Sequence, residues 1–170
     1  MEDFRQLCQR RRSIRTYTDQ PVEREKIDYM LQCALMSPSG KRLNPWEFVV
    51  VTDVDVLRQL AGCKTYGSQM FNTAMAGIVI AADASLTDTW QADAAIAAEH
   101  IQLAATEQGI GACWCHVYGR DESEAMVRRL TGIPEKYSVL CVIALGYKNE
   151  ERKNYDLEKL LYGKVHNERF

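Results

Sequence analysis

The sequence predicts an α+β domain with a small buried sheet. Four short apolar runs rich in valine and isoleucine alternate with longer segments whose apolar residues recur at helical spacing. Glycine and proline stand at the ends of several of these segments, where helices and strands usually stop. With 170 residues, 46% of them hydrophobic, and no linker or internal repeat, the chain is expected to form one domain over residues 1–170.

In the first third of the chain, two helices are predicted on either side of a basic loop. Apolar residues follow helical spacing over residues 4–8 and 27–35, and the second pattern stops at the turn-forming residues 37–40. The β-branched run at residues 47–53 comes directly after an Asn-Pro turn, so it is expected to be a buried strand. A short helix at residues 55–61 should follow it.

The rest of the chain continues the alternation of strands and helices. The remaining predicted elements are strands at residues 77–82, 112–118 and 138–145 and helices at residues 90–108 and 122–130. Gly109 falls where a glycine would end the first helix, and Gly132 with Pro134 should end the second. The first helix is rich in alanine, which allows close approach of a neighbour, in the core or at a subunit contact.

Composition argues against several functional classes. The net charge of −2 gives no overall attraction to nucleic acid, and no apolar stretch reaches the roughly 20 residues of a membrane-spanning helix. The charged first residues do not look like an export signal, so a cytoplasmic location is expected. The six cysteines form no Cys-x-x-Cys pair and mostly lie in apolar runs, which predicts reduced thiols.

The first candidate site is the basic segment with Arg11, Arg12, Ser13 and Arg15. Three guanidinium groups and a hydroxyl within five residues offer donors that suit phosphate oxygens and the polar edge of a planar heterocycle. A solvated basic surface explains the same residues, and taken alone this is the simpler interpretation.

The second candidate is the turn-rich loop at residues 37–46, which enters the first predicted strand. Such loops often carry binding sites. Its polar and turn-forming candidates are Pro38, Ser39, Gly40, Arg42 and Asn44. A helix stop followed by a proline at the strand entry accounts for the prolines and the glycine, but leaves the cluster of donors unexplained.

The third candidate lies at residues 109–119, where closely spaced glycines lead from a helix into a strand. A metal site at Cys113, Cys115 and His116 is disfavoured, because strand alternation puts the histidine on the opposite face from the thiols and no second pair has zinc spacing. The glycines precede a strand, so they are not a dinucleotide fingerprint. No hydrolase or Walker motif occurs, which points to a cofactor that carries the chemistry.

In this order and spacing, the segments resemble the nitroreductase family of flavoenzymes, especially its short members. Residues 11–15 resemble the family's Arg-x-Ser-x-Arg element, and residues 37–48 resemble its Pro-Ser loop running into Gln-Pro-Trp-x-Phe. Residues 109–114, 132–135 and 145–147 are similar to its later signature. The likeness extends over most of the chain.

The resemblance implies a dimeric three-layer fold, with a mostly antiparallel sheet between helices and an FMN site lined by both subunits. Arg11, Ser13 and Arg15 would hold the phosphate, ribityl chain and ring edge, with Arg12 beside them, and Arg152 or Lys153 would add a phosphate contact. The loop from Pro38 to Asn44 would come from the partner subunit. The implied residues beside the flavin ring, through their main-chain groups, are Cys115, His116 and Val117.

This sequence departs from the family pattern at three positions. Arg42 replaces the usual Asn, Asn44 replaces the usual Gln, and His116 replaces Gly or Glu beside the ring. His116 could narrow the substrate space or donate a proton to the substrate, and the sequence leaves these roles open.

The resemblance implies an enzyme in which NADH or NADPH reduces FMN and leaves before a small-molecule acceptor, such as a nitroaromatic or quinone, is reduced. The alternatives are a flavin-binding protein without turnover and a non-flavin module that binds anions. No metal is expected to take part.

Overall fold

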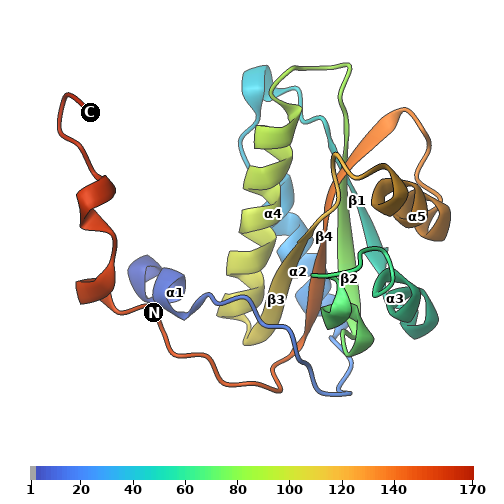
Figure 1. The fold of residues 1–170 in the computed structure, drawn as a ribbon, viewed down its shortest axis with the longest axis horizontal. Coiled ribbons are helices and arrows are strands. Elements are labelled where there is room, and N and C mark those ends of the chain that lie inside the picture. The colour runs from blue at the N-terminus through green and yellow to red at the C-terminus, as the bar shows by residue number, and fades with distance from the viewer. Residues whose placement is uncertain (1–2) are drawn as a thin grey trace.

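The computed structural model describes residues 3–170 and shows a four-stranded sheet between two layers of helices (Figure 1). The strand order is β1-β2-β4-β3, and every neighbouring pair is antiparallel. The strands are β1 (Trp46–Val51), β2 (Ala76–Asp83), β3 (Ile110–His116) and β4 (Tyr137–Tyr147). The predicted α+β class, with an antiparallel sheet flanked by helices, is confirmed.

The five predicted helices are all present. They are α1 (Phe4–Arg10), α2 (Arg24–Leu35), α3 (Val54–Leu60), α4 (Trp90–Glu107) and α5 (Asp121–Thr131). Short 3-10 helices at Gly40–Arg42, Gln69–Asn72, Leu157–Lys159 and Tyr162–Lys164 were not predicted. Helices of three or four residues are too short to show a period in the sequence.

Among the strands, the largest shift concerns β3, which was expected at residues 112–118 and lies at Ile110–His116. It ends early because the main chain turns: the amides of Val117 and Tyr118 both donate to Leu140 O, at 3.0 and 3.1 Å. The predicted glycine ends are confirmed. Gly109 follows α4 with a φ of +76°, and Gly132 caps α5 with a φ of +71°.

Two buried clusters cover the two faces of the sheet. On one face of the sheet, α2 and α4 pack against strand residues such as Ile143. On the other face, α3 and α5 pack against strand residues such as Val142, which precedes Ile143 in β4. α4 lies in the core, where its Ala94, Ala97 and Ala98 have no exposed surface. No helix within residues 3–170 is both long and apolar enough to cross a membrane.

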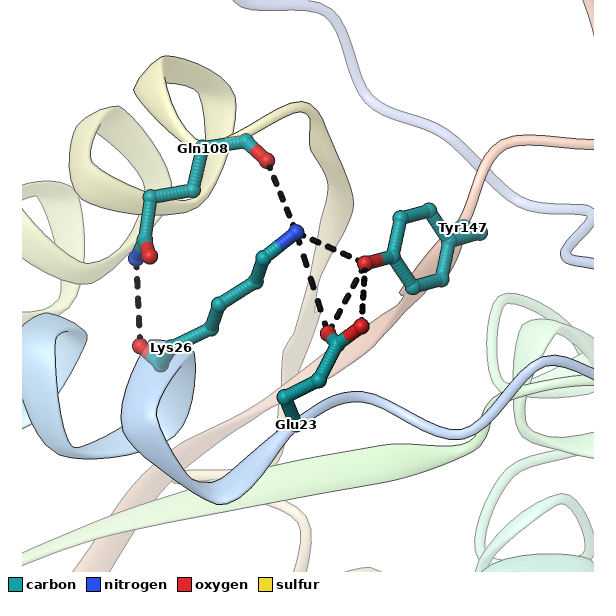
Figure 2. A network of polar contacts seen from close by, with 4 residues as sticks. All are labelled: Glu23, Lys26, Gln108 and Tyr147. Carbon is teal, nitrogen blue, oxygen red and sulfur yellow. Dashed lines mark hydrogen bonds and ion pairs between the residues drawn. The ribbon is translucent and has the colours of Figure 1, made fainter.

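A polar network joins the start of α2 to the ends of α4 and β4 (Figure 2). Lys26 Nζ donates to the Tyr147 hydroxyl at 2.7 Å and to Gln108 O at 3.4 Å, while Gln108 Nε2 donates to Lys26 O at 3.1 Å. The Tyr147 hydroxyl donates in turn to the Glu23 carboxylate at 2.8 Å. Since the three elements meet next to Gly109, the network holds the beginning of β3 in place.

The segment after α1 extends the sheet beyond β3. Ser13 forms a parallel bridge with Ala112, and Ile14 N donates to Ala112 O at 3.0 Å. Glycine at two strand positions leaves room for the side chains of this segment. A Cβ on Gly111 would lie 2.8 Å from Ile14 Cγ2, and one on Gly146 would lie 2.8 Å from Tyr17 Cβ.

We expect Gly146→Ala to destabilise the fold, because the added methyl group would press against the rigid and buried Tyr17. Overpacking of this kind costs about 1–3 kcal/mol in the free energy of unfolding. Urea unfolding followed by circular dichroism measures it. Gly163→Ala is the matched control, since a Cβ there meets nothing within 4 Å. Equal stability of the two variants would contradict this account of the edge.

Candidate functional site

A cluster of basic side chains forms beside the outer edge of β3. The segment that follows α1 runs along this edge, and the chain after β4 returns beside it, as the bridge between Tyr17 and Lys148 shows. We call the resulting group the basic cluster: Arg11, Arg12, Arg15, Lys148, Arg152 and Lys153. The structure therefore brings together the predicted site residues from the two ends of the sequence.

Glu150 links the two segments that carry the cluster. Its carboxylate accepts hydrogen bonds from the amides of Arg15 and Thr16, the latter at 3.1 Å, and from Arg152 Nε at 2.7 Å. Burial acts to raise the pKa of Glu150, but the donors favour the charged form and the net effect lowers it. Glu150 thus stays ionised and fixes Arg152 next to the main chain of Arg15.

Tyr155 holds the other two arginines. The Arg12 guanidinium lies 4.3 Å from the centroid of its ring, and Arg11 Nη2 donates to its hydroxyl at 3.3 Å. Arg12 also donates to Lys153 O. On its other side, Arg11 Nε lies 3.7 Å from the carboxylate of Glu99 in α4. These contacts hold the side chains of Arg11 and Arg12 between α4 and the C-terminal segment.

The cluster carries an excess of positive charge. Its six cations face three nearby carboxylates, those of Glu99, Glu150 and Glu151. Burial, followed by the charge of Arg10, lowers the pKa of Lys148, as expected where cations outnumber anions. A cavity of about 610 Å³ opens at residues 148 and 150–153. The donors and the charge fit a small anionic group such as a phosphate.

The turn-rich loop at residues 37–46 does not lie beside the basic cluster. The amide of Gly40 donates to Asp93 Oδ1 near the start of α4, at 3.0 Å, whereas the basic cluster meets α4 at Glu99. Six helical residues correspond to a rise of about 9 Å. Among the described residues, no hydrogen bond or ion pair joins this loop to Arg11, Ser13 or Arg15.

The loop has an unusual backbone. Lys41, Arg42 and Asn44 have positive φ angles of 52°, 57° and 45°, in the left-handed region that residues other than glycine seldom occupy. The Ser39 hydroxyl supports this shape by accepting from Asn44 N at 3.0 Å and donating to Asn44 Oδ1 at 2.6 Å. Pro38, Arg42 and Asn44 are exposed. Clustered strain of this kind is typical of ligand-binding loops.

At the end of β3, only His116 among the three predicted ring neighbours presents its main chain to the open edge. Ala112 O accepts from Ile14, so alternation along the strand directs the main chain of Cys115 toward β4. The amide of Val117 is bound by Leu140 O and its carbonyl by Arg120 N. His116 O points outward and accepts from Lys64 Nζ at 3.3 Å.

The imidazole of His116 is exposed and stacks on Trp114, with ring centroids 6.3 Å apart and an interplanar angle of 14°. Partial burial, then the charges of Lys64 and Arg120, lower its pKa below the usual 6.5. The ring is therefore mostly neutral at pH 7. Within residues 3–170, no group of three histidine, cysteine or acidic side chains is arranged to hold a metal ion.

Sequence reasoning missed three residues that shape these sites: Glu150, Tyr155 and Asp93. The first two belong to a C-terminal segment without regular spacing. Asp93 was overlooked inside an alanine-rich helix, although an acid on the apolar face of a helix is a signal. It is only 5% exposed, and the amide of Gly40 and the hydroxyl of Thr89, at 3.5 Å, are its hydrogen-bond donors. A buried carboxylate needs such partners.

Comparisons with known proteins agree with the resemblance to the nitroreductase family. The model of the nitroreductase family matches residues 8–63 and 62–147. A protein from Archaeoglobus fulgidus, provisionally named NADH dehydrogenase/NAD(P)H nitroreductase, is 39% identical over 93% of this chain and 92% of its own. The structure of an FMN-dependent nitroreductase from Clostridium difficile R20291 is 44% identical, with a TM-score of 0.94 over 96% of this chain and 98% of that one.

A third relative, from Bacteroides thetaiotaomicron, has the same provisional name as the Archaeoglobus protein. Its crystal structure is 34% identical and covers the whole of both chains with a TM-score of 0.93.

We expect Asp93→Ala to loosen the loop, because the amide of Gly40 would lose its charged acceptor. A hydrogen bond to a charged group contributes about 1.5–3 kcal/mol, so the amide should exchange with deuterium roughly ten-fold faster or more. Hydrogen exchange of the peptide containing Gly40 measures this. Asp93→Asn keeps an acceptor oxygen, so its exchange rate should lie between those of the unsubstituted protein and Asp93→Ala. Unchanged exchange in Asp93→Ala would show that the loop holds its shape without this contact.

Proposed function

We propose that this chain, which belongs to the nitroreductase family, is an FMN-dependent oxidoreductase that takes hydride from NADH or NADPH. The observation that carries the proposal is that Glu150 joins Arg152 to the main chain of Arg15 at the edge of β3. Two distant segments build one anion site there, at the position where the family resemblance expects the flavin phosphate. The FMN-dependent relative from Clostridium difficile supports the choice of cofactor.

The residues present suit FMN better than FAD. One terminal phosphate matches the basic cluster, in which Arg11, Arg12 and Arg15, with Arg152 or Lys153, would bind it. Ser13 would contact the ribityl chain. Within residues 3–170, no helix begins with a glycine-rich fingerprint that would hold a second phosphate and adenosine. When bound, FMN supplies hydride transfer from the nicotinamide donor to the acceptor.

The ring of the flavin would lie along the open edge of β3, with His116 beside it. Of the three expected neighbours, His116 has its main-chain groups at that edge, although its carbonyl also accepts from Lys64. The main-chain groups of Cys115 and Val117 bond within the fold. His116 would also limit the space in which the donor and then a nitroaromatic, quinone or similar acceptor bind in turn. Its protonated fraction falls as pH rises through a pKa below 6.5, so proton donation by His116 would favour acidic conditions.

A homodimer would complete the site, with Pro38, Ser39, Gly40, Arg42 and Asn44 reaching the flavin of the partner. Two features of this loop support that arrangement. The loop is held at the start of α4, away from the basic cluster of its own chain. Its exposed backbone is strained at Arg42 and Asn44, as is typical of ligand-binding loops.

The visible spectrum of the purified protein tests the function. We expect flavin absorption after incubation with FMN, tighter binding of FMN than of FAD, and bleaching when NADH or NADPH is added without air. Restoration of the absorption by a quinone would complete one turnover. A flavin spectrum that neither donor bleaches would indicate a binding protein without turnover. Failure to bind either flavin would favour an anion-binding module of another kind.

Arg11→Ala and Arg15→Ala should each weaken FMN binding by roughly ten-fold or more, since a charged hydrogen bond in a partly enclosed site contributes about 1.5–3 kcal/mol. Ser13→Ala should cost less, because its hydroxyl is neutral. Arg129→Ala is the matched control, as that arginine is exposed on the distant α5. Fluorescence titration gives the affinities, and thermal unfolding of each apoprotein excludes loss of fold. Equal affinity in all four variants would refute the phosphate site.

A further inference from the structure

Two buried thiols form a pair outside the proposed flavin site. Cys63 lies in the turn after α3 and Cys115 lies near the end of β3, and both belong to the cluster that α3 and α5 cover. Their exposed fractions are 6% and 1%. The two thiols interact, since each changes the pKa of the other, although their residues stand far apart in the sequence.

The surrounding contacts hold the two thiols together. Cys63 N donates to Leu60 O at 3.0 Å, and the buried Ser123 hydroxyl donates to Cys63 O at 2.7 Å. The residue after each cysteine is joined to the other segment, since Lys64 Nζ donates to His116 O at 3.3 Å. The turn is thus fastened to both β3 and α5, which limits how far the sulfur atoms can separate.

Only one member of the pair reaches solvent. Cys63 lines a cavity of about 740 Å³ that lies between residues 62–66 and 119–123, whereas Cys115 stays behind it. The interaction with Cys115 lowers the pKa of Cys63 despite its burial, with smaller contributions from Ser68 and Lys64. The other thiols on this face, Cys113 and Cys115, have raised pKa values, so Cys63 is the more nucleophilic.

We propose that Cys63 and Cys115 form an oxidisable dithiol, in which Cys63 reacts with hydroperoxides and Cys115 closes a disulfide. The Cys63 thiolate attacks hydrogen peroxide and breaks its O–O bond, giving a sulfenic acid and water after proton transfer. The Cys115 sulfur then attacks the sulfenic sulfur, and the hydroxyl leaves as water with the Cys115 proton. Two thiols lose two electrons in all, and the peroxide gains them.

The consequence of oxidation is a covalent link between the turn after α3 and the end of β3, next to His116. All six cysteines are free thiols in the structure, which therefore corresponds to the reduced form. A thiol reductant restores this form by exchange with the disulfide. The chemistry needs only the two sulfurs and a peroxide, so it holds whether or not the protein binds flavin.

The test is native oxidation with one equivalent of hydrogen peroxide, followed by intact mass and non-reducing peptide mapping. We expect the protein to become lighter by two hydrogen atoms and the peptides of Cys63 and Cys115 to be joined. Before oxidation, iodoacetamide should label Cys63 at least about ten-fold faster than Cys113, whose thiol shares this face. Absence of the joined peptides, or a link to Cys113 instead, would overturn the proposal.

Variants separate the roles of the two sulfurs. In Cys115→Ser the reaction should stop at a sulfenic acid that dimedone traps on Cys63, and in Cys63→Ser neither the disulfide nor an adduct on Cys115 should form. Cys113→Ser should behave like the unmodified chain. Dimedone on Cys115 rather than Cys63 would reverse the assignment and refute it. The mapping of the unsubstituted protein decides the question even if a variant does not fold.

Discussion

The single bridge between Ser13 and Ala112 determines where the basic cluster can form. An exposed strand edge offers unpaired main-chain groups, and here the segment after α1 uses those of Ala112. This pairing sets the register of Arg11 and Arg15 against β3, and so the face on which each guanidinium lies. It depends on Gly111, because a larger residue would push Ile14 off the strand.

Much of the fold was predictable, since helical spacing and β-branched runs follow directly from which faces are buried. The ends of β3 were not, because the turn at Val117 depends on Leu140, a residue remote in sequence. The site likewise combines residues that local patterns predict with residues that they do not. Arginine spacing marked Arg11 and Arg15, but no local pattern reveals that Tyr155 holds the first and Glu150 the main chain of the second. The strained Lys41, Arg42 and Asn44 depend on contacts such as those of Ser39, which propensity does not encode.

α4 connects the features on which the proposed function depends. Its first turns hold the loop through Asp93, its middle meets Arg11 through Glu99, and its end enters the network of Lys26 and Tyr147. Ala97, Ala98 and Ala105, which lie between these positions, pack in the core without exposed surface. Because a packed helix moves as a rigid body, the loop and the basic cluster keep a fixed separation.

The contacts of the basic cluster also bear on the order of folding. Arg12 and Lys153 are 141 residues apart in sequence, and Gln9 donates to Tyr155 O across 146 residues. Closing so long a loop costs entropy that only a formed sheet can offset. During synthesis the N-terminal arginines therefore cannot meet Glu150 and Tyr155 until that late segment has left the ribosome.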